Sequence, residues 1–329
     1  MASIASRRRW GVALAALLGL AALPAAAAEW PTRPVRLIVP YAPGGGTDVV
    51  ARVLAQTMTT QLPQPVVVEN RAGAGGGLGA EAVARSAPDA HTFLFTNNGF
   101  SVLRLIAPNP NLDYHQALTP ITIVSEAPMI MMTANNLPVT NLQEFLALVR
   151  ANPGRYDYGS TGTGGTNGLT ALMFLQAADV RLNEIPYRGG APATLDLAAG
   201  RIAMLFDASS TALATTRGGQ ARALAVSTAQ RSPAAPELPT LREAGVPADM
   251  SIWNAILVPS ATAPEQRQAL HAALTRALAE PELRARFTEF GMDRIPALPE
   301  AESRRFIAAE VERWEGLLRN AQAGPTATK

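Results

Sequence analysis

The chain has 329 residues, of which 48% are hydrophobic and 16% are charged, so it can bury the core of one or two globular domains. The formal net charge is +2, and without the three arginines of the amino-terminal leader described below 25 of the 28 basic residues remain against 26 acidic ones, which makes nucleic acid an unexpected partner. Cysteine is absent, and this excludes disulfide bonds, a thiolate nucleophile and a lipid-modified cysteine.

The amino terminus has the features of a cleavable export signal. Arg7, Arg8 and Arg9 precede an apolar run over residues 11–23, which the small residues 25–28 follow. The run is shorter than the ~20 apolar residues of a membrane-spanning helix. We therefore expect residues 1–28 to be removed, and the mature chain, beginning at Glu29, to be periplasmic without a lipid anchor. A twin-arginine signal also begins in this way, so the export route stays open.

The first part of the mature chain alternates strand and helix patterns. Residues 35–39 have the alternation of a strand, and Thr47 and Asp48 then begin an amphipathic helix. Further patterns predict strands over residues 66–68, 91–96, 121–124 and 129–133 and a helix over residues 78–84. This alternation predicts a largely parallel sheet.

A second series of the same kind follows a helix break. Thr140 and Gln143 form a capping box for a helix through Leu148, and the Asn-Pro-Gly sequence at 152–154 ends it. Later patterns predict strands over residues 156–158, 184–185, 204–206, 224–226 and 253–258, and helices over 170–178, 193–199, 264–280, 282–290 and 299–318. Gly291 suits a carboxyl-terminal helix cap. We therefore expect two α/β domains.

Residue types that cofactor and metal sites need are missing or isolated. The only lysine is Lys329, which excludes a phosphate-binding loop or Schiff-base chemistry at any plausible site. The glycine clusters lack the third glycine of a dinucleotide-binding loop. His91, His115 and His271 lie far apart and belong to no compact metal-ligand motif. We expect no cofactor, no metal and no enzymatic activity.

One serine partly matches a hydrolase motif. Gly162 follows Ser160 at the spacing of a nucleophile elbow, but Tyr158 stands where that elbow has glycine. A hydrolase using Ser160 would also need distant catalytic partners that the sequence does not reveal. This alternative is therefore the least favoured.

Two polar, glycine-rich loops, each between a strand and a helix, are the strongest candidates for a site. They are residues 43–48, Pro-Gly-Gly-Gly-Thr-Asp, and residues 159–166, Gly-Ser-Thr-Gly-Thr-Gly-Gly-Thr. Backbone N–H groups at a helix start carry partial positive charge, so such loops hold an oxyanion without a cationic side chain. One loop in each domain predicts a carboxylate gripped from two sides. The alternative is that both are ordinary turns, with Asp48 a helix cap and Ser160 a turn residue.

Short motifs around these loops extend over nearly the whole mature chain. They are Trp30-Pro31-x-Arg33-Pro34, Ile38-Val39-Pro40-Tyr41-x-Pro43-Gly44-Gly45-Gly46-Thr47-Asp48-x-x-Ala51-Arg52, Val66-Val67-Val68-Glu69-Asn70-Arg71-x-Gly73-Ala74-Gly75-Gly76, Pro88-Asp89, Tyr158-Gly159-Ser160-x-Gly162-x-Gly164, Pro186-Tyr187-Arg188-Gly189-Gly190, Leu224-Ala225-Val226 and Pro239-Thr240-x-x-Glu243-x-Gly245. At these residues, and in this order, the chain resembles the Bug receptors, the extracytoplasmic substrate-binding proteins of tripartite tricarboxylate transporters.

The resemblance implies a periplasmic binding protein fold, with two doubly wound α/β domains, a hinge and a ligand cleft between them. Carried over, residues 29–128 and 251–329 form one discontinuous domain and residues 129–250 form the other. The family binds small organic acids, including di- and tricarboxylates, acidic amino acids and aromatic acids. The implied function is a solute receptor, expected to be a monomer, for a tripartite tricarboxylate-type permease. A periplasmic sensor acting on a sensor kinase is the alternative.

The resemblance also implies which residues contact the ligand. The first loop would hold one carboxylate with help from the second, while Asn97, Asp207 and the glycine pair at 189–190 would line the rest of the cleft. Arg188 is expected either to pair with a second carboxylate or to be a solvated surface charge. Tyr41 is expected either to bound the pocket or to pack beneath the loop. The full set is Tyr41, Pro43, Gly44, Gly45, Gly46, Thr47, Asp48, Asn97, Ser160, Thr161, Gly162, Thr163, Gly164, Arg188, Gly189, Gly190 and Asp207.

Two positions depart from the family's pattern. Ala90 stands where the family has glycine after Pro-Asp, which predicts a modified turn. Gly168 stands where members often have histidine before Leu169, so a ligand contact from that side chain is missing. Neither departure identifies the acid, because recognition through the backbone leaves little signature in residue identity.

Overall fold

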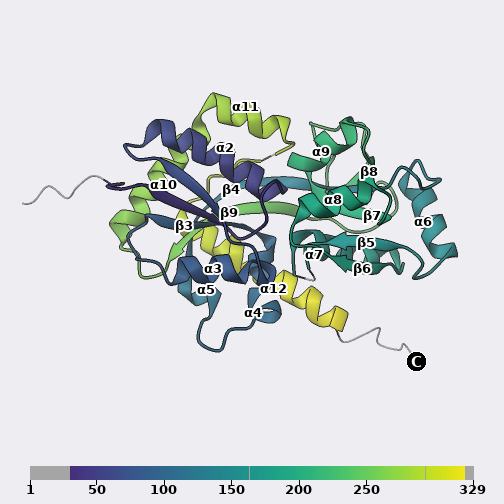
Figure 1. Ribbon diagram of the computed structural model, residues 1–329, viewed down its shortest axis with the longest axis horizontal. Helices are drawn as coiled ribbons and strands as arrows, with labels where there is room; N and C mark the ends of the chain where they lie inside the picture. The colour runs from purple at the N-terminus through teal and green to yellow at the C-terminus, as the bar shows by residue number, and fades with distance from the viewer. Residues whose placement is uncertain (1–29, 163, 293, 323–329) are drawn as a thin grey trace, which may run out of the picture.

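The computed structural model describes residues 30–162, 164–292 and 294–322, which Figure 1 draws as ribbons. The predicted export signal over residues 1–28 and the candidate ligand residue Thr163 lie outside this range. No helix within it is both long and apolar enough to cross a bilayer.

The strands form one mixed sheet that extends through two halves of the molecule. They are β1 (Val35–Val39), β2 (Val66–Asn70), β3 (Thr92–Asn97), β4 (Leu118–Thr133), β5 (Asp157–Ser160), β6 (Asn183–Pro186), β7 (Met204–Ala208), β8 (Arg222–Val226) and β9 (Ser251–Pro259). Their order is β2-β1-β3-β9-β4-β7-β5-β6, with β8 beside β4. The first half, at the left of Figure 1, contains β1, β2, β3, β9 and the beginning of β4, and the second contains the rest.

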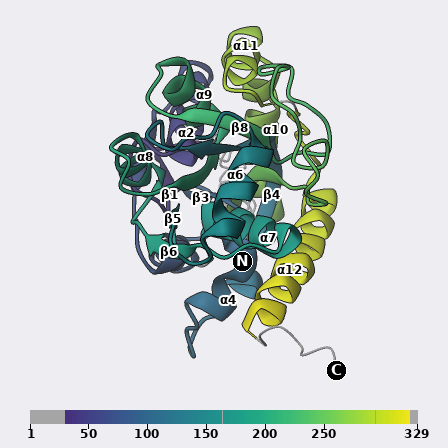
Figure 2. The ribbon, with the colours of Figure 1, turned by 90° about the vertical axis from the view of Figure 1, so that its right-hand side faces the viewer.

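Helices cover both faces of each half. They are η1 (Ala74–Gly76), η2 (Asn98–Val102), α2 (Gly46–Gln61), α3 (Gly77–Ala84), α4 (Leu103–Ile106), α5 (Tyr114–Ala117), α6 (Leu142–Ala151), α7 (Thr166–Ala178), α8 (Gly190–Ala198), α9 (Ser209–Arg217), α10 (Pro264–Ala279), α11 (Pro281–Glu289) and α12 (Glu300–Gln322). The last three return to the first half after the second is complete, and α12 then continues beside α7 of the second half (Figure 2). Both ends of the described chain therefore contribute to the first half.

Strand alternation explains why each half has a core on both faces. Val35, Leu37 and Val39 of β1 are fully buried in the core that also contains α2, α10 and α11. Ile38, between them in sequence, is buried in a separate core with α3 and α5. Successive side chains of a strand point to opposite faces, so one apolar strand serves both layers.

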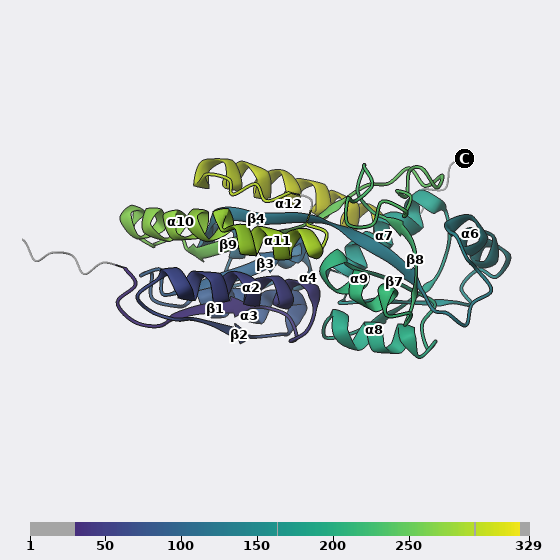
Figure 3. The same ribbon diagram turned by 90° about the horizontal axis from the view of Figure 1, so that it is seen from above.

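The strand β4 joins the halves and corrects two predictions. The sequence predicted separate strands over 121–124 and 129–133, whereas β4 is one strand of 16 residues that runs from one half into the other (Figure 3). Residues 125–128, which separate the two predicted strands, do not end β4. Glu126 N–H donates to the Arg294 carbonyl and Met129 N–H donates to Ser227 Oγ, both at 2.9 Å. The prediction of a largely parallel sheet was also wrong for β4 and β9. These strands carry the chain out of the first half and back, so they lie antiparallel.

Three local predictions have different outcomes. The helix α9 was missed, because its only buried apolar residues are Ala212 and Leu213 and the rest of its sequence is rich in serine and threonine. The capping box of α6 was displaced by one residue, since Asn141 rather than Thr140 accepts from the backbone, at Glu144 N–H. The cap at Gly291 is confirmed, with φ of 71°.

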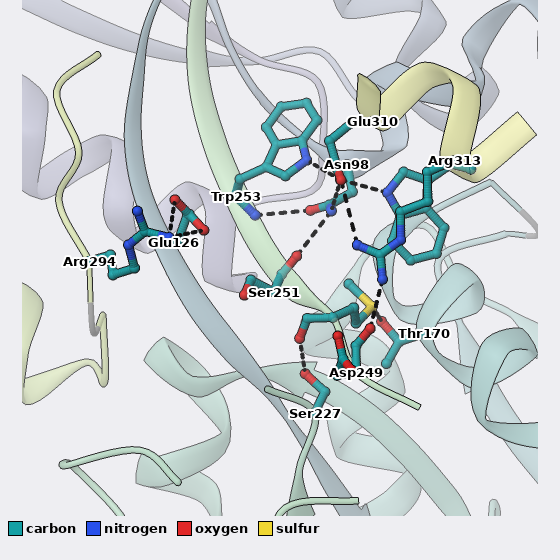
Figure 4. Close-up of polar contacts among 12 residues, drawn as sticks. Asn98, Glu126, Thr170, Ser227, Asp249, Ser251, Trp253, Arg294, Glu310 and Arg313 are labelled. Carbon is teal, nitrogen blue, oxygen red and sulfur yellow. Dashed lines mark hydrogen bonds and ion pairs between the residues drawn. The ribbon is translucent and has the colours of Figure 1, made fainter. Parts of the chain in front are cut away.

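A polar cluster ties α12 to the segments that cross between the halves (Figure 4). One carboxylate oxygen of Glu310 accepts hydrogen bonds from Trp253 Nε1 at 2.8 Å and Trp314 Nε1 at 2.7 Å. Asn98 donates to the same oxygen at 3.3 Å and accepts from Trp253 N–H at 3.0 Å. Arg313 donates to the Asp249 carbonyl at 2.7 Å, just before β9 begins. The carboxyl-terminal helix is thus bonded to the crossing strands.

Candidate functional site

A small cavity lies between the two halves, beyond the carboxyl ends of β1, β3, β5 and β7. Its volume is about 30 Å³. In open α/β sheets this edge is where ligands bind, because the loops that follow the strands converge there. We call it the inner cavity, and its walls are Tyr41, Ala42, Gly45, Gly46, Thr47, Asp48, Asn97, Met129, Thr161, Asn167, Gly189, Gly190, Asp207, Ala208 and Ile252.

Four helices begin at the inner cavity, and none of them has a side-chain cap. The uncapped starts are those of α2, α7, α8 and α9, whose N-cap residues are Gly45, Gly165, Gly189 and Ala208. The first turns of helices have backbone N–H groups without intrahelical partners and carry partial positive charge. Their convergence on one cavity creates an anion-binding environment without a cationic side chain.

Glycine allows the two halves to meet at this cavity. A Cβ added to Gly46 would lie 2.6 Å from Ala208 Cβ, and one added to Gly189 would lie 2.8 Å from Ala42 Cβ. Each of these contacts joins a loop of one half to a loop of the other. A larger residue at either position would hold the halves apart, so the structure shows the cleft in a closed arrangement.

Asp48 is buried at the inner cavity, but its oxygens are already bonded. One oxygen accepts from Gly44 N–H and from Arg52 Nε, both at 2.9 Å, and the other accepts from Asn70 Nδ2 at 2.8 Å. Burial acts to raise the pKa of Asp48, but the hydrogen bonds from Arg52, Gly44 and Asn70 outweigh it and hold the pKa below its ordinary value. The N-cap is Gly45, so Asp48 reaches back from inside the helix and holds the loop in shape.

Asn97 connects the side chains on the first-half wall. Its Oδ1 accepts from Tyr41 OH at 2.6 Å, and its Nδ2 donates to Thr47 Oγ1 at 2.8 Å. Because Thr47 Oγ1 accepts this bond, its own proton is available to a group in the cavity. Burial raises the pKa of Tyr41 to about 12, so the phenol is neutral and donates. Tyr41 therefore both lines the cavity and packs beneath the loop.

Asp207 is the second buried acid of the inner cavity, with 3% of its surface exposed. Thr211 Oγ1 donates to it at 2.5 Å, and Asn167 Nδ2 donates at 3.3 Å. Burial raises the pKa of Asp207 above its ordinary value despite these hydrogen bonds. Unlike Asp48, it has no guanidinium partner among the described residues. Asp207 therefore takes up a proton at a higher pH than an ordinary aspartate does.

The second glycine-rich loop contributes through different residues from the first. Ser160 is fully buried, donates to Glu184 Oε1 at 2.6 Å and accepts from Gly162 N–H at 3.0 Å. Neither contact involves a histidine, so no catalytic pair is seen at Ser160 in the described residues. Thr161 and Asn167 are the residues around this loop that line the inner cavity.

The structure brings ten of the predicted ligand residues to the inner cavity, namely Tyr41, Gly45, Gly46, Thr47, Asp48, Asn97, Thr161, Gly189, Gly190 and Asp207. Five others line neither the inner cavity nor the larger cavity beside it that is described next, namely Pro43, Gly44, Ser160, Gly162 and Gly164. Sequence reasoning missed Met129 and Ile252, which belong to the crossing strands, and Asn167, which no motif marked. The serine and threonine residues that follow Ala208 are the sequence signal from which this further helix start could have been predicted.

A larger outer cavity of about 480 Å³ adjoins the inner one, and the two share Tyr41 and Thr161 as walls. On the first-half side the outer cavity is lined by Leu78 and the glycine-rich turn before it, and on the other side by Tyr187 and Arg188. Tyr187 OH donates to Asp196 at 2.8 Å, which fixes the ring. Arg188 is exposed at this cavity.

The two departures from the family pattern have clear structural settings. Ala90 is fully buried with φ of 59°, so it takes the left-handed conformation that glycine adopts easily. A Cβ at Gly168 would lie 2.5 Å from the Gly162 carbonyl oxygen. Any side chain at position 168 would therefore displace the second loop.

The described residues contain no cluster of three or more histidine, aspartate or glutamate side chains suited to a metal. Each histidine instead meets at least one backbone group through its ring, and His91 does so at both nitrogens. The contacts are His91 with Thr32 N–H at 3.1 Å, His115 with the Phe100 carbonyl at 2.9 Å and His271 with the Leu298 carbonyl at 3.2 Å. The histidines are thus part of the packing.

Comparison with known proteins relates the chain to a family of receptors. Residues 50–322 match the model of the tripartite tricarboxylate transporter family receptor. Protein BugT of Bordetella pertussis is 35% identical over 311 residues, which cover 94% of this chain and 95% of BugT. The solved structure of the periplasmic binding protein BugD is 32% identical, with a TM-score of 0.84 over 89% of this chain and 99% of that one. The structure of R. palustris Rpa4515 with adipate is 30% identical, with a TM-score of 0.85 over 89% of this chain and 98% of that one.

Proposed function

The chain belongs to the tripartite tricarboxylate transporter receptor family, and from this premise we propose that it binds a small carboxylic acid in the periplasm and delivers it to a membrane permease. The same relatives confirm the resemblance to Bug receptors, the periplasmic binding protein fold and the expectation of a receptor rather than an enzyme. One of them is described with bound adipate, a dicarboxylate.

The observation that carries the carboxylate proposal is the convergence of four uncapped helix starts on the inner cavity. No arginine or lysine lines that cavity among the described residues, so an anion there depends on backbone N–H groups. Thr47 supplies a hydroxyl donor, because its oxygen accepts from Asn97 and its proton is free to bond a ligand. Asp48 acts indirectly, because it positions the first loop through Gly44 and Arg52.

The same geometry supports a proposal of two domains that close on the ligand. We propose that residues 29–128 with 251–329 form one domain and residues 129–250 the other, with a hinge where β4 and β9 cross. The inner cavity supports this division, because its walls come from both sides of it. Closure would bring the start of α2 against the starts of α8 and α9. The anion site would therefore be complete only when the two domains have closed around a ligand.

Thermal unfolding tests the proposed ligand class. The mature chain from Glu29 would be unfolded and refolded to remove carried-over ligand, then heated with di- and tricarboxylates, amino acids and aromatic acids. A ligand at a hundred times its Kd adds ~2.7 kcal/mol to the free energy of unfolding, so a matching acid raises the midpoint by several degrees. A refolded protein that no acid in the panel stabilises would contradict a carboxylate receptor.

The permease is favoured over the signalling partner, because the matching family is described as a transporter receptor. Deletion of the gene is expected to abolish uptake of the labelled acid that the thermal screen identifies. A sensor would instead leave the initial uptake rate unchanged and alter only the transcription of responding genes.

A further inference from the structure

Two neighbouring residues, Asn97 and Asn98, make their contacts in different places. Asn97 ends β3 and lines the inner cavity, where it accepts from Tyr41 OH at 2.6 Å and donates to Thr47 Oγ1 at 2.8 Å. Asn98 lines neither the inner nor the outer cavity, and its amide donates to Glu310 on α12. This pair of residues therefore connects the wall of the cavity to the last helix.

The side chain of Asn98 is completely buried, and each of its polar groups is bonded (Figure 4). Its Oδ1 accepts from Trp253 N–H at 3.0 Å, and its Nδ2 donates to the Ser251 carbonyl at 3.1 Å and to Glu310 Oε2 at 3.3 Å. The indoles of Trp253 and Trp314 donate to the same glutamate oxygen. A buried polar network whose members are all bonded holds them in one geometry, so Glu310 fixes the Asn98 amide.

The backbone that follows Asn97 is packed closely against both sides of the cleft. Gly99 N–H donates to Asn97 Oδ1 at 3.0 Å. A Cβ added to Gly99 would lie 2.9 Å from Tyr41 OH and 3.2 Å from the Gly164 carbonyl oxygen. A displacement of η2 would therefore move the Asn97 amide, to which Thr47 Oγ1 is bonded.

We propose that Glu310 is a positioning residue of the ligand site, which acts through Asn98 and Asn97 although it lines neither cavity. This inference rests on the proposed carboxylate receptor and adds a residue of α12 to the groups that set its affinity. Loss of the Glu310 carboxylate frees Asn98, and Asn97 then no longer holds the Thr47 hydroxyl in its binding orientation. Binding of an acid must restore that order, and the cost of ordering lowers the affinity.

Calorimetry of the refolded mature chain tests the proposal at a temperature where every variant is folded, with adipate, succinate and citrate titrated in turn. We expect Glu310→Ala to weaken binding of each acid that binds by about fivefold or more. Glu310→Gln keeps an acceptor oxygen for Asn98 and both indoles, so its affinity should be within about twofold of the wild type. Glu312→Ala, at an exposed position of the same helix, is the matched control and should leave the affinity unchanged.

A double-mutant cycle tests whether the effect passes through Asn97. In an Asn97→Ala background, Glu310→Ala should weaken binding no further. Equal losses in the two backgrounds would overturn the proposal, and so would an affinity that Glu310→Ala leaves unchanged while it lowers the stability. If Glu310→Ala does not fold, Asn98→Ser, whose side chain is too short to reach Glu310, takes its place in the same measurements.

Amide hydrogen exchange of the free protein, followed by NMR, tests the same coupling without a ligand. The N–H groups of Gly44 and Val49 are hydrogen-bonded in the first loop, which contacts Asn97 through Thr47. In Glu310→Ala we expect faster exchange at both amides and unchanged exchange in the paired strands β1 and β2. Unchanged exchange at Gly44 and Val49, or equal acceleration in β1 and β2, would overturn the positioning role.

The two readouts separate this inference from the proposed function. If none of these acids and no acid of the wider thermal panel binds, the carboxylate receptor fails, whereas the exchange rates still decide whether Glu310 positions the first loop. If an acid binds equally well to the wild type and to Glu310→Ala, the receptor stands and the positioning role fails.

Discussion

At the scale of single residues, two aspartates of one cavity have opposite protonation behaviour. Asp48 is held ionised, because Arg52 and two neutral donors stabilise its carboxylate. Asp207 is equally buried but receives hydrogen bonds only from neutral groups, so burial raises its pKa. The negative charge of Asp48 is thus compensated locally, whereas that of Asp207 is not.

The pH dependence of binding follows from Asp207. Its pKa in the folded protein is raised, so between the ordinary and the folded pKa the native state binds more protons than the unfolded state, and the free energy of unfolding decreases as the pH rises through that window. Affinity for a fully ionised acid should fall over the same window, because ionised Asp207 repels the ligand. Calorimetry at a series of pH values is expected to show this fall in the wild type and its absence in Asp207→Asn.

The exposed Asp179 provides a control for that variant, because asparagine tolerates its left-handed backbone with φ of 50°. Asp179→Asn should keep the wild-type pH profile. If Asp207→Asn also keeps it, another group is responsible for the titration.

Removal of the Asp48 carboxylate tests its role in positioning the first loop. Asp48→Ala deprives Gly44 N–H, Arg52 and Asn70 of their acceptor, so we expect a loss of ~1–3 kcal/mol of stability with cooperative unfolding retained, together with weaker binding. Ser160→Ala should weaken binding less, since Ser160 does not line the inner cavity. Denaturant unfolding and calorimetry measure both effects, and wild-type affinity in both variants would remove the two loops from the site.

At the scale of elements, helix starts rather than side chains create the anion site. Sequence analysis recognised the starts of α2 and α7 from their glycine-rich loops. The start of α9 was missed together with the helix, although Ala208 at its N-cap lies on the cavity wall. A helix start therefore acts as a binding group only because the fold aims it at the cavity.

Gly46→Ala is expected to impair closure rather than folding. The new Cβ would lie 2.6 Å from Ala208 Cβ across the cleft, a contact that exists only when the halves meet. We expect affinity for the acid to fall about tenfold or more, which corresponds to ~1.4 kcal/mol, while unfolding of the free protein changes little. Calorimetry and denaturant unfolding of the same preparation separate the two effects.

Gly316→Ala is the matched control for Gly46→Ala, at a glycine that makes no contact across the cleft. A Cβ at Gly316, in the middle of α12, would meet nothing within 4 Å. Alanine there should stabilise the protein by ~0.5–1 kcal/mol without changing affinity, because it reduces the backbone freedom of the unfolded chain. If Gly46→Ala also leaves affinity unchanged, the glycine contact is not required for closure.

At the scale of the whole molecule, α12 forms hydrogen bonds to the segments in which the chain leaves the first half and returns to it. The cluster in Figure 4 bonds Glu310 of this helix to Trp253 at the start of β9 and to Asn98 after β3. Glu310 thus contacts residues 57 positions away at Trp253 and 212 positions away at Asn98. The first half is therefore complete only when the last helix has packed.

Glu310→Ala tests this contribution to global stability. The substitution leaves the indole N–H groups of Trp253 and Trp314 and the Asn98 amide without their acceptor. We expect the free energy of unfolding to fall by ~2–4 kcal/mol, measured with denaturant. Glu312→Ala, at an exposed position of the same helix, should cost less than ~0.5 kcal/mol, and equal effects of the two variants would contradict the role of the cluster.

Much of the fold was predictable because its signals are local. The apolar alternation of β1 and the glycine after α11 each depend on a few neighbouring residues, and the structure confirms both. The continuity of β4 was not predictable, because the groups that sustain it at Glu126 and Met129 are supplied by Arg294 and Ser227 from distant segments. Local patterns therefore mark where elements are but not where two of them merge.

The sequence by itself determined the receptor family, the α/β class, the two glycine-rich loops and the absence of cysteine chemistry, because each is written in residue types and short spacings. Only the tertiary structure decided that four helix starts share one cavity, that the pKa of Asp207 is raised while that of Asp48 is lowered, and that Leu78 and Arg188 lie on opposite walls of the outer cavity. The physical reason is that desolvation, charge compensation and close approach depend on atoms brought together from distant parts of the chain.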